Sequence, residues 1–198
     1  MDDGEKVKQE DLSHPLADSS DNPVWDGATI RLFGARNEII AFQLIIEADG
    51  SGASDVYVEV SDLESGAYTI PGSESGPADP YDYRGRCVEL FTEHYLHITS
   101  RSNNSWDADA AAPSDYYLGR VPDALIPFCA SAGLGGAPFD IPPSRNQGVW
   151  VDIYIPRDAA AGTYTGTVTI TEDSSVFQVI PLSLADYGFT LQIGRAHV

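Results

Sequence analysis

Basic and sulfur-containing side chains are scarce in this 198-residue chain, which has two lysines, two cysteines and one methionine. Lysine and arginine together number 11 against 30 aspartates and glutamates, so the formal net charge is −19. Such a charge repels the phosphates of nucleic acids and the surfaces of anionic membranes, and neither is expected as a partner. An extracellular or salt-tolerant surface accounts for the charge without any specific partner. Binding of a cation at a single site is the more specific alternative.

Long apolar runs are absent, and none approaches the length of about 20 residues that a membrane span needs. The first five residues, MDDGE, lack the basic start and apolar region of a signal peptide, so none is expected in this sequence. Cys87 and Cys129 lie far apart in the chain. They are compatible with one disulfide or with two buried free thiols.

The last six residues, IGRAHV, continue no pattern of the preceding chain. They are the translation of a nucleotide string that resembles a common short-read sequencing adapter. We therefore expect residues 193–198 to be a sequence artefact and exclude them from the fold prediction.

The clearest structural signal is a series of three strands within residues 147–184. Apolar residues alternate with polar ones at the period of two that is typical of β-strands, and a row of four threonines opposes the apolar row of the second strand. One face of this antiparallel meander is therefore buried and the other faces water. The predicted apolar rows are Val149, Val151, Ile153 and Ile155; Tyr164, Gly166, Val168 and Ile170; and Val176, Ile180, Leu182 and Leu184.

Further strands are predicted at residues 29–33, 38–48, 56–60 and 87–100. Both faces of residues 38–48 are largely apolar, which predicts a central strand; a helix is the rival interpretation, but β-branched side chains and flanking glycines favour a strand. The core is predicted to contain Phe42, Leu44, Val151, Ile153, Val168 and Ile170.

Residues 101–147 show no regular pattern and are far longer than an ordinary connection. Their aromatic and aliphatic side chains predict a packed loop, with Leu125, Ile126 and Phe128 across an end or edge of the sandwich. Trp106, Tyr116 and Tyr117 are expected nearer its tip. The predicted fold class is thus all-β: an antiparallel β-sandwich with one long packed loop.

Three segments resemble the N-terminal β-sandwich domain of glycoside hydrolase family 123-like proteins: DGEKV at residues 3–7, WDGATIRLFGARNEIIAFQLIIEA at 25–48 and VWVDIYIPRDAAAGTYTGTVTIT at 149–171. The resemblance implies a secreted or periplasmic, glycan-active protein. It also implies that the catalytic acids belong to a larger (β/α)-barrel beyond residue 191, so no catalytic residue can be assigned here. Family 123 itself resembles substrate-assisted hexosaminidases.

Residue patterns that could bind metals are weak. His94 and His97 are three residues apart on one strand and so point to opposite faces. Asp107, Asp109 and Asp115 could supply oxygen ligands to calcium, but the run lacks the glycine and the terminal glutamate of a known calcium loop. No metal and no cofactor is predicted. The segment DAAAGTY, residues 158–164, resembles a tyrosine corner, which is a structural feature.

The expected division of the chain is an extended lead-in over 1–28 with at most one strand, a β-sandwich accessory domain over 29–192, and the artefact over 193–198. The first functional hypothesis is a non-catalytic domain that supports its own missing C-terminal catalytic domain. The second is an independent carbohydrate-binding module, and the third is a structural cell-surface domain. Trp106, Tyr116 and Tyr117 are the candidates for glycan binding or domain docking.

Overall fold

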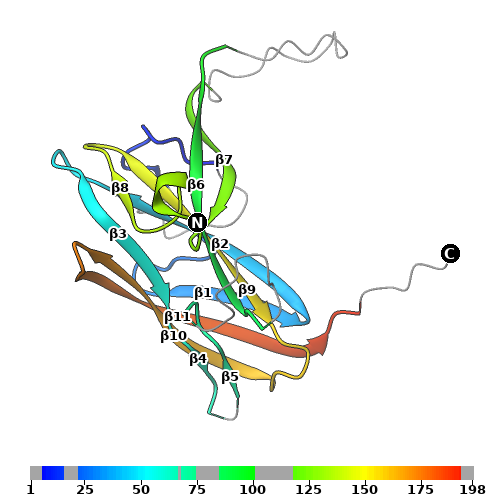
Figure 1. Cartoon of the computed structure of the whole chain (residues 1–198). Coiled ribbons are helices and arrows are strands. Elements are labelled where there is room, and N and C mark those ends of the chain that lie inside the picture. The colour runs from blue at the N-terminus through cyan, green and yellow to red at the C-terminus, as the bar shows by residue number, and fades with distance from the viewer. Residues whose placement is uncertain (1–5, 16–21, 67, 75–84, 101–117, 193–198) are drawn as a thin grey trace, which may run out of the picture.

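Two β-sheets packed face to face make up the protein, as the computed structural model in Figure 1 shows. The structure describes residues 6–15, 22–66, 68–74, 85–100 and 118–192. Within these ranges 3₁₀ geometry occurs at Pro15 and in the short turn η3, Ala132–Leu134, and no helix there is long and apolar enough to cross a membrane. The predicted all-β sandwich is confirmed.

Sheet A has seven strands, and its main order is β1-β11-β10-β3-β8. A two-stranded extension, β4–β5, pairs with β10. The bounds are β1 Ile30–Arg36, β3 Ala53–Val60, β4 Leu63–Glu64, β5 Thr69–Ile70, β8 Phe139–Ile141, β10 Gly162–Glu172 and β11 Ser175–Thr190. Pairing is antiparallel except between β1 and β11, which are parallel. The expectation of purely antiparallel sheets is therefore wrong at this one pair, because β1 joins a strand distant in sequence rather than its neighbour β2.

Sheet B has four antiparallel strands in the order β2-β9-β6-β7. Their bounds are β2 Glu38–Glu47, β6 Val88–Ile98, β7 Gly119–Pro127 and β9 Asn146–Ile155. Figure 1 shows that the β6–β7 hairpin extends beyond the other strands at one end of the molecule.

The core between the sheets is made by the predicted alternating rows. Val149, Val151, Ile153 and Ile155 of β9 are completely buried, and Tyr164, Val168 and Ile170 face them from sheet A. Of the six predicted core residues, five are buried, and Leu44 is partly buried against the same cluster. Val176 departs from the prediction: it is exposed, because a register shift after Ile170 displaces the tip of the β10–β11 hairpin from the core row.

β2 lies at an edge of sheet B, so its prediction as a central strand was wrong. Its inner row contains Phe42, which is buried, whereas Ile39 on its outer row is 64% exposed. The outer row includes a buried glutamine, Gln43, beside half-buried Ala41 and Ile45. Apolar residues on both faces of a strand thus reflect partial cover of the outer face here, not a second neighbouring strand.

The prediction of a single long loop over 101–147 is also wrong for residues 118–147, the part of it that the structure describes. Residues 119–127 form β7, which pairs with β6, and residues 139–141 form β8, which pairs with β3. β7 contains Pro122 and Pro127, which is tolerated because β7 is an edge strand and needs hydrogen bonds on one side only. Of the three residues expected to pack, Phe128 does contact the core, whereas Leu125 is exposed.

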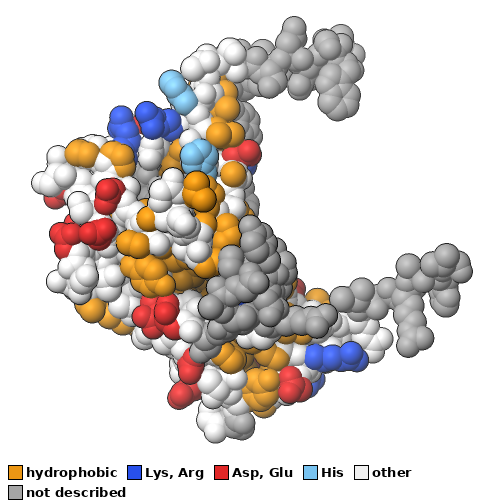
Figure 2. Space-filling view, viewed as in Figure 1, with side chains coloured by type: hydrophobic (Ala, Val, Ile, Leu, Met, Phe, Trp, Pro, Cys, Tyr) orange, Lys and Arg blue, Asp and Glu red, His pale blue; other side chains and the backbone are white. Residues whose placement is uncertain are grey.

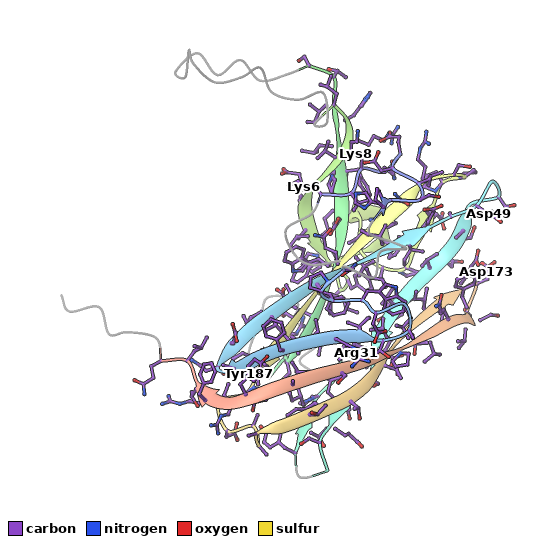
Figure 3. The ribbon with its side chains drawn as sticks, turned by 180° about the vertical axis from the view of Figure 1, so that it is seen from behind. Lys6, Lys8, Arg31, Asp49, Asp173 and Tyr187 are labelled. Atoms are coloured by element: carbon purple, nitrogen blue, oxygen red, sulfur yellow. The ribbon has the colours of Figure 1, made fainter. Side chains whose placement is uncertain are left out.

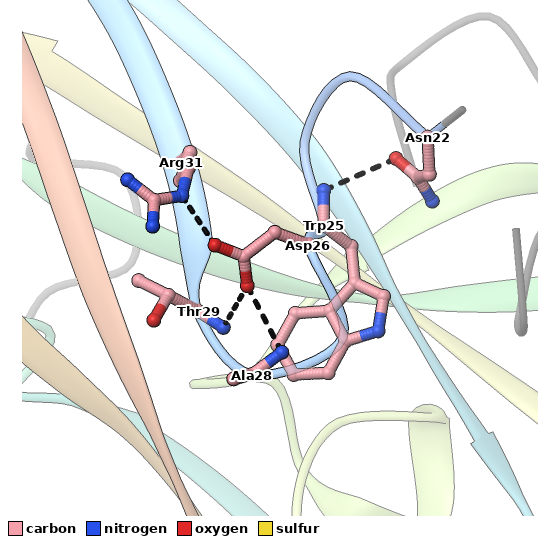
Figure 4. A network of polar contacts seen from close by, with 6 residues as sticks. All are labelled: Asn22, Trp25, Asp26, Ala28, Thr29 and Arg31. Atoms are coloured by element: carbon pink, nitrogen blue, oxygen red, sulfur yellow. Dashed lines mark hydrogen bonds and ion pairs between the residues drawn. The ribbon is translucent and has the colours of Figure 1, made fainter. Parts of the chain in front are cut away.

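Two turns are fixed by side chains. The Tyr164 hydroxyl donates to the Ala160 carbonyl at 2.5 Å, so the predicted tyrosine corner is present. Before β1, the Asp26 carboxylate accepts hydrogen bonds from the backbone N–H groups of Ala28 and Thr29 and from Arg31 (Figure 4). The Arg31 guanidinium, followed by these backbone donors, lowers the pKa of Asp26. This turn sets the entry into β1.

The two cysteines are not paired. Cys87 is half-buried and Cys129 is exposed, so the alternative of free thiols is the one observed, although the thiols are less buried than expected.

The buried inner row of β2 gives a stability prediction. Phe42→Ala removes a side chain that is 1% exposed and leaves a cavity between the sheets, so the free energy of unfolding should fall by about 3–5 kcal/mol. Ile39→Ala on the same strand removes a side chain that faces solvent and should change stability by about 0.5 kcal/mol or less. Urea denaturation of both variants measures the difference. Equal losses would contradict the assigned faces of β2.

Candidate functional site

The aromatic residues predicted as a binding or docking site, Trp106, Tyr116 and Tyr117, lie outside the described residues, as do Asp107, Asp109 and Asp115. Their assignment stays a prediction. The described part of the chain instead shows a cleft that the sequence did not reveal.

This cleft has a volume of about 450 Å³ and lies at the end of the sandwich where the β6–β7 hairpin of sheet B extends beyond the other strands. One wall comes from β6, β7 and the start of β9, and carries Thr92, Glu93, His94, Arg120 and Gln147. The opposite wall comes from β3, β8 and the segment before β8, and carries Asp55, Asp140, Phe139, Pro138 and Gly136. In Figure 1 β8 and the adjoining end of β3 lie beside the base of the hairpin. The volume is within the range of about 300–1,000 Å³ that is usual for small-molecule pockets.

The cleft opens because both sheets become irregular at the same level. β6 pairs with β9 only from Val88 to Thr92, and its pairing with β7 shifts register between His94 and Tyr95. In sheet A the β3–β8 register shifts between Ala53 and Val56, and Asp55 has a positive φ of 48°. Bulges of this kind bend strands and re-aim side chains, and they occur often beside functional sites.

Side chains span the gap between β6 and β9. The Gln147 amide nitrogen donates to the carbonyl oxygens of Glu93, at 2.8 Å, and Gly148, at 2.9 Å. The Gly148 N–H donates to the Tyr95 hydroxyl at 3.0 Å. The Glu93 carboxyl lies over Gly148 so closely that a Cβ added there would be 2.2 Å from Oε2. A larger residue at this position would force the Glu93 carboxyl to move.

Polar groups are unusually well buried in the cleft walls. Gln9, Thr92, Glu93 and Gln147 are each at most 7% exposed. Thr92 Oγ1 and Glu93 Oε2 have no hydrogen-bond partner among the residues that the structure describes. Buried polar atoms are normally satisfied, because an unmet donor or acceptor costs about 1–3 kcal/mol. Both atoms are themselves buried, and Thr92 and Glu93, as neighbours on one strand, point to opposite faces of sheet B, so the two atoms do not mark one ligand position.

Burial raises the pKa of Glu93 to about 7, and the positive charge of Lys6 counteracts only part of this effect. Burial also raises the pKa of the neighbouring Tyr95, and Glu93 adds to that rise. Glu93 is therefore a carboxyl group that is substantially protonated near neutral pH. In that state it can donate as well as accept a hydrogen bond.

Charges are distributed unevenly around the cleft. Figure 2 shows acidic side chains along the border formed by the ends of β3 and the β10–β11 hairpin, and basic side chains near the base of the β6–β7 hairpin. Figure 3 shows the same separation, with Lys6 and Lys8 beside the hairpin and Asp49 and Asp173 at the tips of the β2–β3 and β10–β11 loops, outside the cleft. Arg120 on the hairpin wall contacts Glu10 at 3.7 Å, and Asp140 on the other wall accepts the Asp55 N–H at 3.0 Å.

A second group of acids lies on the outer face of sheet B. Glu89 of β6 and Asp152 of β9 are register partners. Burial raises the pKa of both carboxyl groups, and Arg86, 3.8 Å from Glu89, opposes the rise there. The Trp150 indole N–H donates to Asp152 at 2.6 Å. This pair is the nearest approach to a catalytic carboxylate pair among the described residues, but Asp152 is held by the indole rather than presented to an open cavity.

The predicted histidine assignment stands, since His94 and His97 are both exposed strand residues. No group of three or more His, Cys, Asp or Glu side chains that could hold a metal ion occurs within the described ranges. One feature of the sequence could have predicted the cleft. Thr92 and His94 occupy positions in β6 where the alternation begun by Val88 and Leu90 would place apolar side chains. Polar residues in a core row mark the level at which the core ends.

Exposed aromatic residues gather at the other end of sheet A. Phe33 of β1 and Tyr187 of β11 are each 63% exposed, and their rings are in tilted contact with centroids 5.8 Å apart. Phe189 and Leu191 follow on the same strand and beyond its end, and both are exposed. We call Phe33, Tyr187, Phe189 and Leu191 the aromatic end patch. In Figure 3 Tyr187 lies far from the hairpin end that carries Lys6.

Glu93 gives a prediction for the pH dependence of stability. Its folded-state pKa of about 7 exceeds the reference value of 4.5, so between these pH values the folded state binds more protons than the unfolded state. Stability contributed by protonated Glu93 is therefore lost as pH rises through about 7. Relative to Glu93→Gln, which cannot ionise, the native protein should lose about 3 kcal/mol between pH 4.5 and pH 8.

Urea denaturation of both proteins across that pH range measures this difference. Glu59→Gln, at an exposed position of β3, is the matched control and should follow the native profile. Parallel profiles for native protein and Glu93→Gln would show that Glu93 is ionised and solvated in the folded state.

Comparisons with known proteins support the resemblance predicted from the sequence. The family model described as the glycoside hydrolase 123 N-terminal domain matches residues 98–172. Among curated proteins, none matches the chain by sequence. Among solved structures, a family 123 glycoside hydrolase from Clostridium perfringens, described in connection with glycolipid glycan hydrolysis, shares the fold with a TM-score of 0.57 and 18% identity. That match covers 82% of this chain.

The chain spans only 23% of the length of the Clostridium protein. A second structure is that of AvmM, which catalyses macrocyclization in alchivemycin A biosynthesis. The match covers 84% of this chain and 87% of the AvmM chain. Its identity is 11% and its TM-score 0.39, which is too low for any inference. The family model matches residues 98–172, which end with β10, and the solved structure shares the sandwich fold, so this chain is similar to glycoside hydrolase 123 N-terminal domains.

Proposed function

We propose that this chain is a non-catalytic N-terminal β-sandwich domain of a secreted or periplasmic glycan-active protein, and that it supports a C-terminal catalytic domain. The family match and the small share of the Clostridium glycoside hydrolase that the chain covers support this proposal. The partner is the protein's own following domain. Nucleic acids and anionic membranes are disfavoured as partners by the net charge of −19.

The observation that carries the proposal is the aromatic end patch. Single exposed apolar residues are common on protein surfaces, but a contiguous group of large ones marks an interaction site. Phe33 and Tyr187 contact each other across the parallel pair β1–β11, and Phe189 lies two residues further along β11. The patch therefore lies where the chain leaves sheet A, which is where a following domain would meet this one.

The end of β11 is held in a defined direction. The Leu191 N–H donates to the Arg36 carbonyl at 2.9 Å, and the Asn37 side-chain amide donates to the Leu191 carbonyl at 3.0 Å. The Tyr154 hydroxyl in turn donates to the Asn37 amide oxygen at 3.1 Å, and Arg36 donates to the Gly188 carbonyl. These bonds tie β11 to the β1–β2 turn and to sheet B. A domain attached at this point would start from a rigid platform rather than from a free tail.

Hydrogen exchange tests the docking surface. In the full-length parent protein, amides of β1 should exchange more slowly than in the 198-residue chain, because β1 is the edge strand beneath Phe33 and would be covered. Phe33→Ser combined with Tyr187→Ser in the parent should abolish the added protection. Val179→Ser is the control, since Val179 is an exposed residue of β11 outside the patch.

Equal exchange of β1 in the two proteins would refute docking on this patch. The same experiment tests the earlier prediction for Trp106, Tyr116 and Tyr117. Added protection at residues 106–117 alone would place the domain contact there instead.

The non-catalytic role gives a separate prediction. The purified chain should not hydrolyse aryl hexosaminides, because Asp152, the better-placed acid of the Glu89–Asp152 pair, is already engaged by Trp150. Release of the aryl group is measured by absorbance against a buffer blank. Turnover that is abolished by Asp152→Asn or Glu89→Gln would overturn the accessory role, whereas turnover unaffected by both would indicate a contaminating enzyme.

A further inference from the structure

Residues 6–15 cross the outer face of sheet B, and we call them the N-terminal strap. At one end the Lys6 ammonium donates to the Pro122 carbonyl of β7 at 3.0 Å. Towards the other end the Ser13 N–H donates to the Glu47 carboxylate of β2 at 2.7 Å. β7 and β2 are the two edge strands of sheet B, so the strap runs from one edge of the sheet to the other. Figure 3 shows its first part, with Lys6 and Lys8, beside the β6–β7 hairpin.

The middle of the strap joins the strands that diverge at the cleft. The Gln9 N–H donates to the Arg120 carbonyl of β7 at 3.0 Å, and the Gln9 carbonyl accepts from the Asn146 N–H of β9 at 2.9 Å. The Asn146 side-chain amide donates to the carbonyls of Lys8, at 3.2 Å, and Asp11, at 2.6 Å. Gln9 and Arg120 also line the cleft. The strap therefore closes one side of the cleft while it holds the hairpin to β9.

Glu93 lies beneath this strap. Its carboxyl lies over Gly148, on the outer face of sheet B, where no second sheet covers it. Glu93 is nevertheless only 4% exposed. The strap supplies the cover, since Val7 has no exposed surface and Lys6 is near enough to Glu93 to act on its charge. Glu93 Oε2 has no hydrogen-bond partner among the described residues, so the site is closed without being satisfied.

We propose that the N-terminal strap is a pH-dependent closure, which opens when the Glu93 carboxyl group beneath it ionises. The neutral carboxyl can stay buried, whereas the carboxylate must recover the water that the strap excludes. Opening breaks the bonds of the strap but leaves the core between the sheets intact. It also disconnects β7 from β9 and removes Gln9 from the cleft wall, so the cleft widens as pH rises.

Burial determines the direction of this effect. In the closed state it raises the pKa of Glu93 to about 7, and in the open state the pKa returns towards its reference value of 4.5. The open state therefore binds fewer protons above pH 4.5. The equilibrium constant for opening rises with pH, by up to about 70-fold between pH 5 and pH 8.

The other charges around Glu93 do not reverse this direction. Lys6 and the amino terminus favour the carboxylate, but burial outweighs both. Burial also raises the pKa of Tyr95, so its hydroxyl stays neutral over this range. Residues 146–148 of β9 have no ionisable side chain. The remaining charged or titratable groups on the packed elements are Lys8, Glu10, Asp11 and His14 of the strap, His94 of β6, and Arg120 and Asp123 of β7.

Hydrogen exchange of the purified 198-residue chain measures strap opening. The amides of Gln9 and Asn146 report the strap, because each donates one of the bonds at its middle, and amides within the β2–β9 pairing report the core. After correction for intrinsic exchange rates, we expect the opening constant at Gln9 and Asn146 to rise by about tenfold or more between pH 5 and pH 8. It should exceed that of the core amides and respond little to dilute urea, because a local opening exposes little surface.

Three variants identify the group that titrates. Glu93→Gln keeps the shape of the side chain but cannot ionise, and it should remove the rise at both strap amides. Glu89→Gln makes the same change four residues earlier on the same face of β6, opposite Asp152, and should keep the rise. His94→Gln should also keep it, although histidine commonly changes charge in this range.

A rise that persists in Glu93→Gln, or one that disappears in His94→Gln, would overturn the proposal. Equal opening constants and equal urea dependence for the strap and core amides would also overturn it, and this comparison needs only the native protein. The strap is tested in the chain alone. Failure of docking at the aromatic end patch therefore leaves this proposal untouched, and failure of the strap to open leaves docking untouched.

Discussion

The packing of β9 against sheet A is the contact on which the rest of the molecule depends. Val149, Val151, Ile153 and Ile155 have no exposed surface, and they face Tyr164, Val168 and Ile170 across the sandwich. β9 is also the strand that joins β2 to β6 within sheet B. Removal of this row from water therefore fixes the separation of the sheets, the register of β2 and the position of β6 together. At about 1.5–3 kcal/mol for each fully buried aliphatic side chain, the row makes a contribution comparable with the whole net stability of a domain.

The cleft is a direct consequence of where this row ends. Val149 pairs with Thr92, and beyond them β9 continues with Gly148 and Gln147 while β6 turns away with β7. Where the strands diverge, the Gln147 amide donates to the carbonyl oxygens of Glu93 and Gly148, and the Tyr95 hydroxyl accepts from the Gly148 N–H, so side chains replace the regular ladder there. Beyond this point the apolar alternation of β6 stops. The N-terminal segment joins the β6–β7 hairpin to β9 there, because the Gln9 N–H donates to the Arg120 carbonyl and the Gln9 carbonyl accepts from the Asn146 N–H. The β6–β9 pairing thus supports the buried core from Val88 to Thr92, and the cleft begins where this pairing ends.

Local pattern was sufficient for the parts of the fold that are periodic, and it failed where pairing depends on distant residues. The alternation over β9, β10 and β11 predicted the buried rows, and the tyrosine corner followed from its own seven residues. The parallel pairing of β1 with β11 could not be read from either strand, since register between distant strands is decided by the whole core. β7 was missed because Pro122 and Pro127 suggest an irregular loop, although an edge strand accepts both. The cleft was missed for a related reason: Gln147 bridges β9 and β6 only at the level where their pairing ends, and that level depends on the register of both strands.

Glu93 is a buried carboxyl whose ionisation destabilises the fold. Its burial disfavours the charged form, so near and above neutral pH the protein carries a group whose ionisation opposes folding, against a typical net stability of only about 5–15 kcal/mol. The positive charge of Lys6 offsets only part of this cost, and Oε2 has no hydrogen-bond partner among the described residues. Nor is Glu93 required to separate the strands, since Gln147 bridges them through the backbone carbonyl of residue 93 and not through its side chain. An apolar side chain at this position would keep that bridge and remove the cost. Buried polar groups are normally satisfied by the protein itself, so Glu93, whose Oε2 has no partner among the described residues, is a departure that the packing of the core does not require.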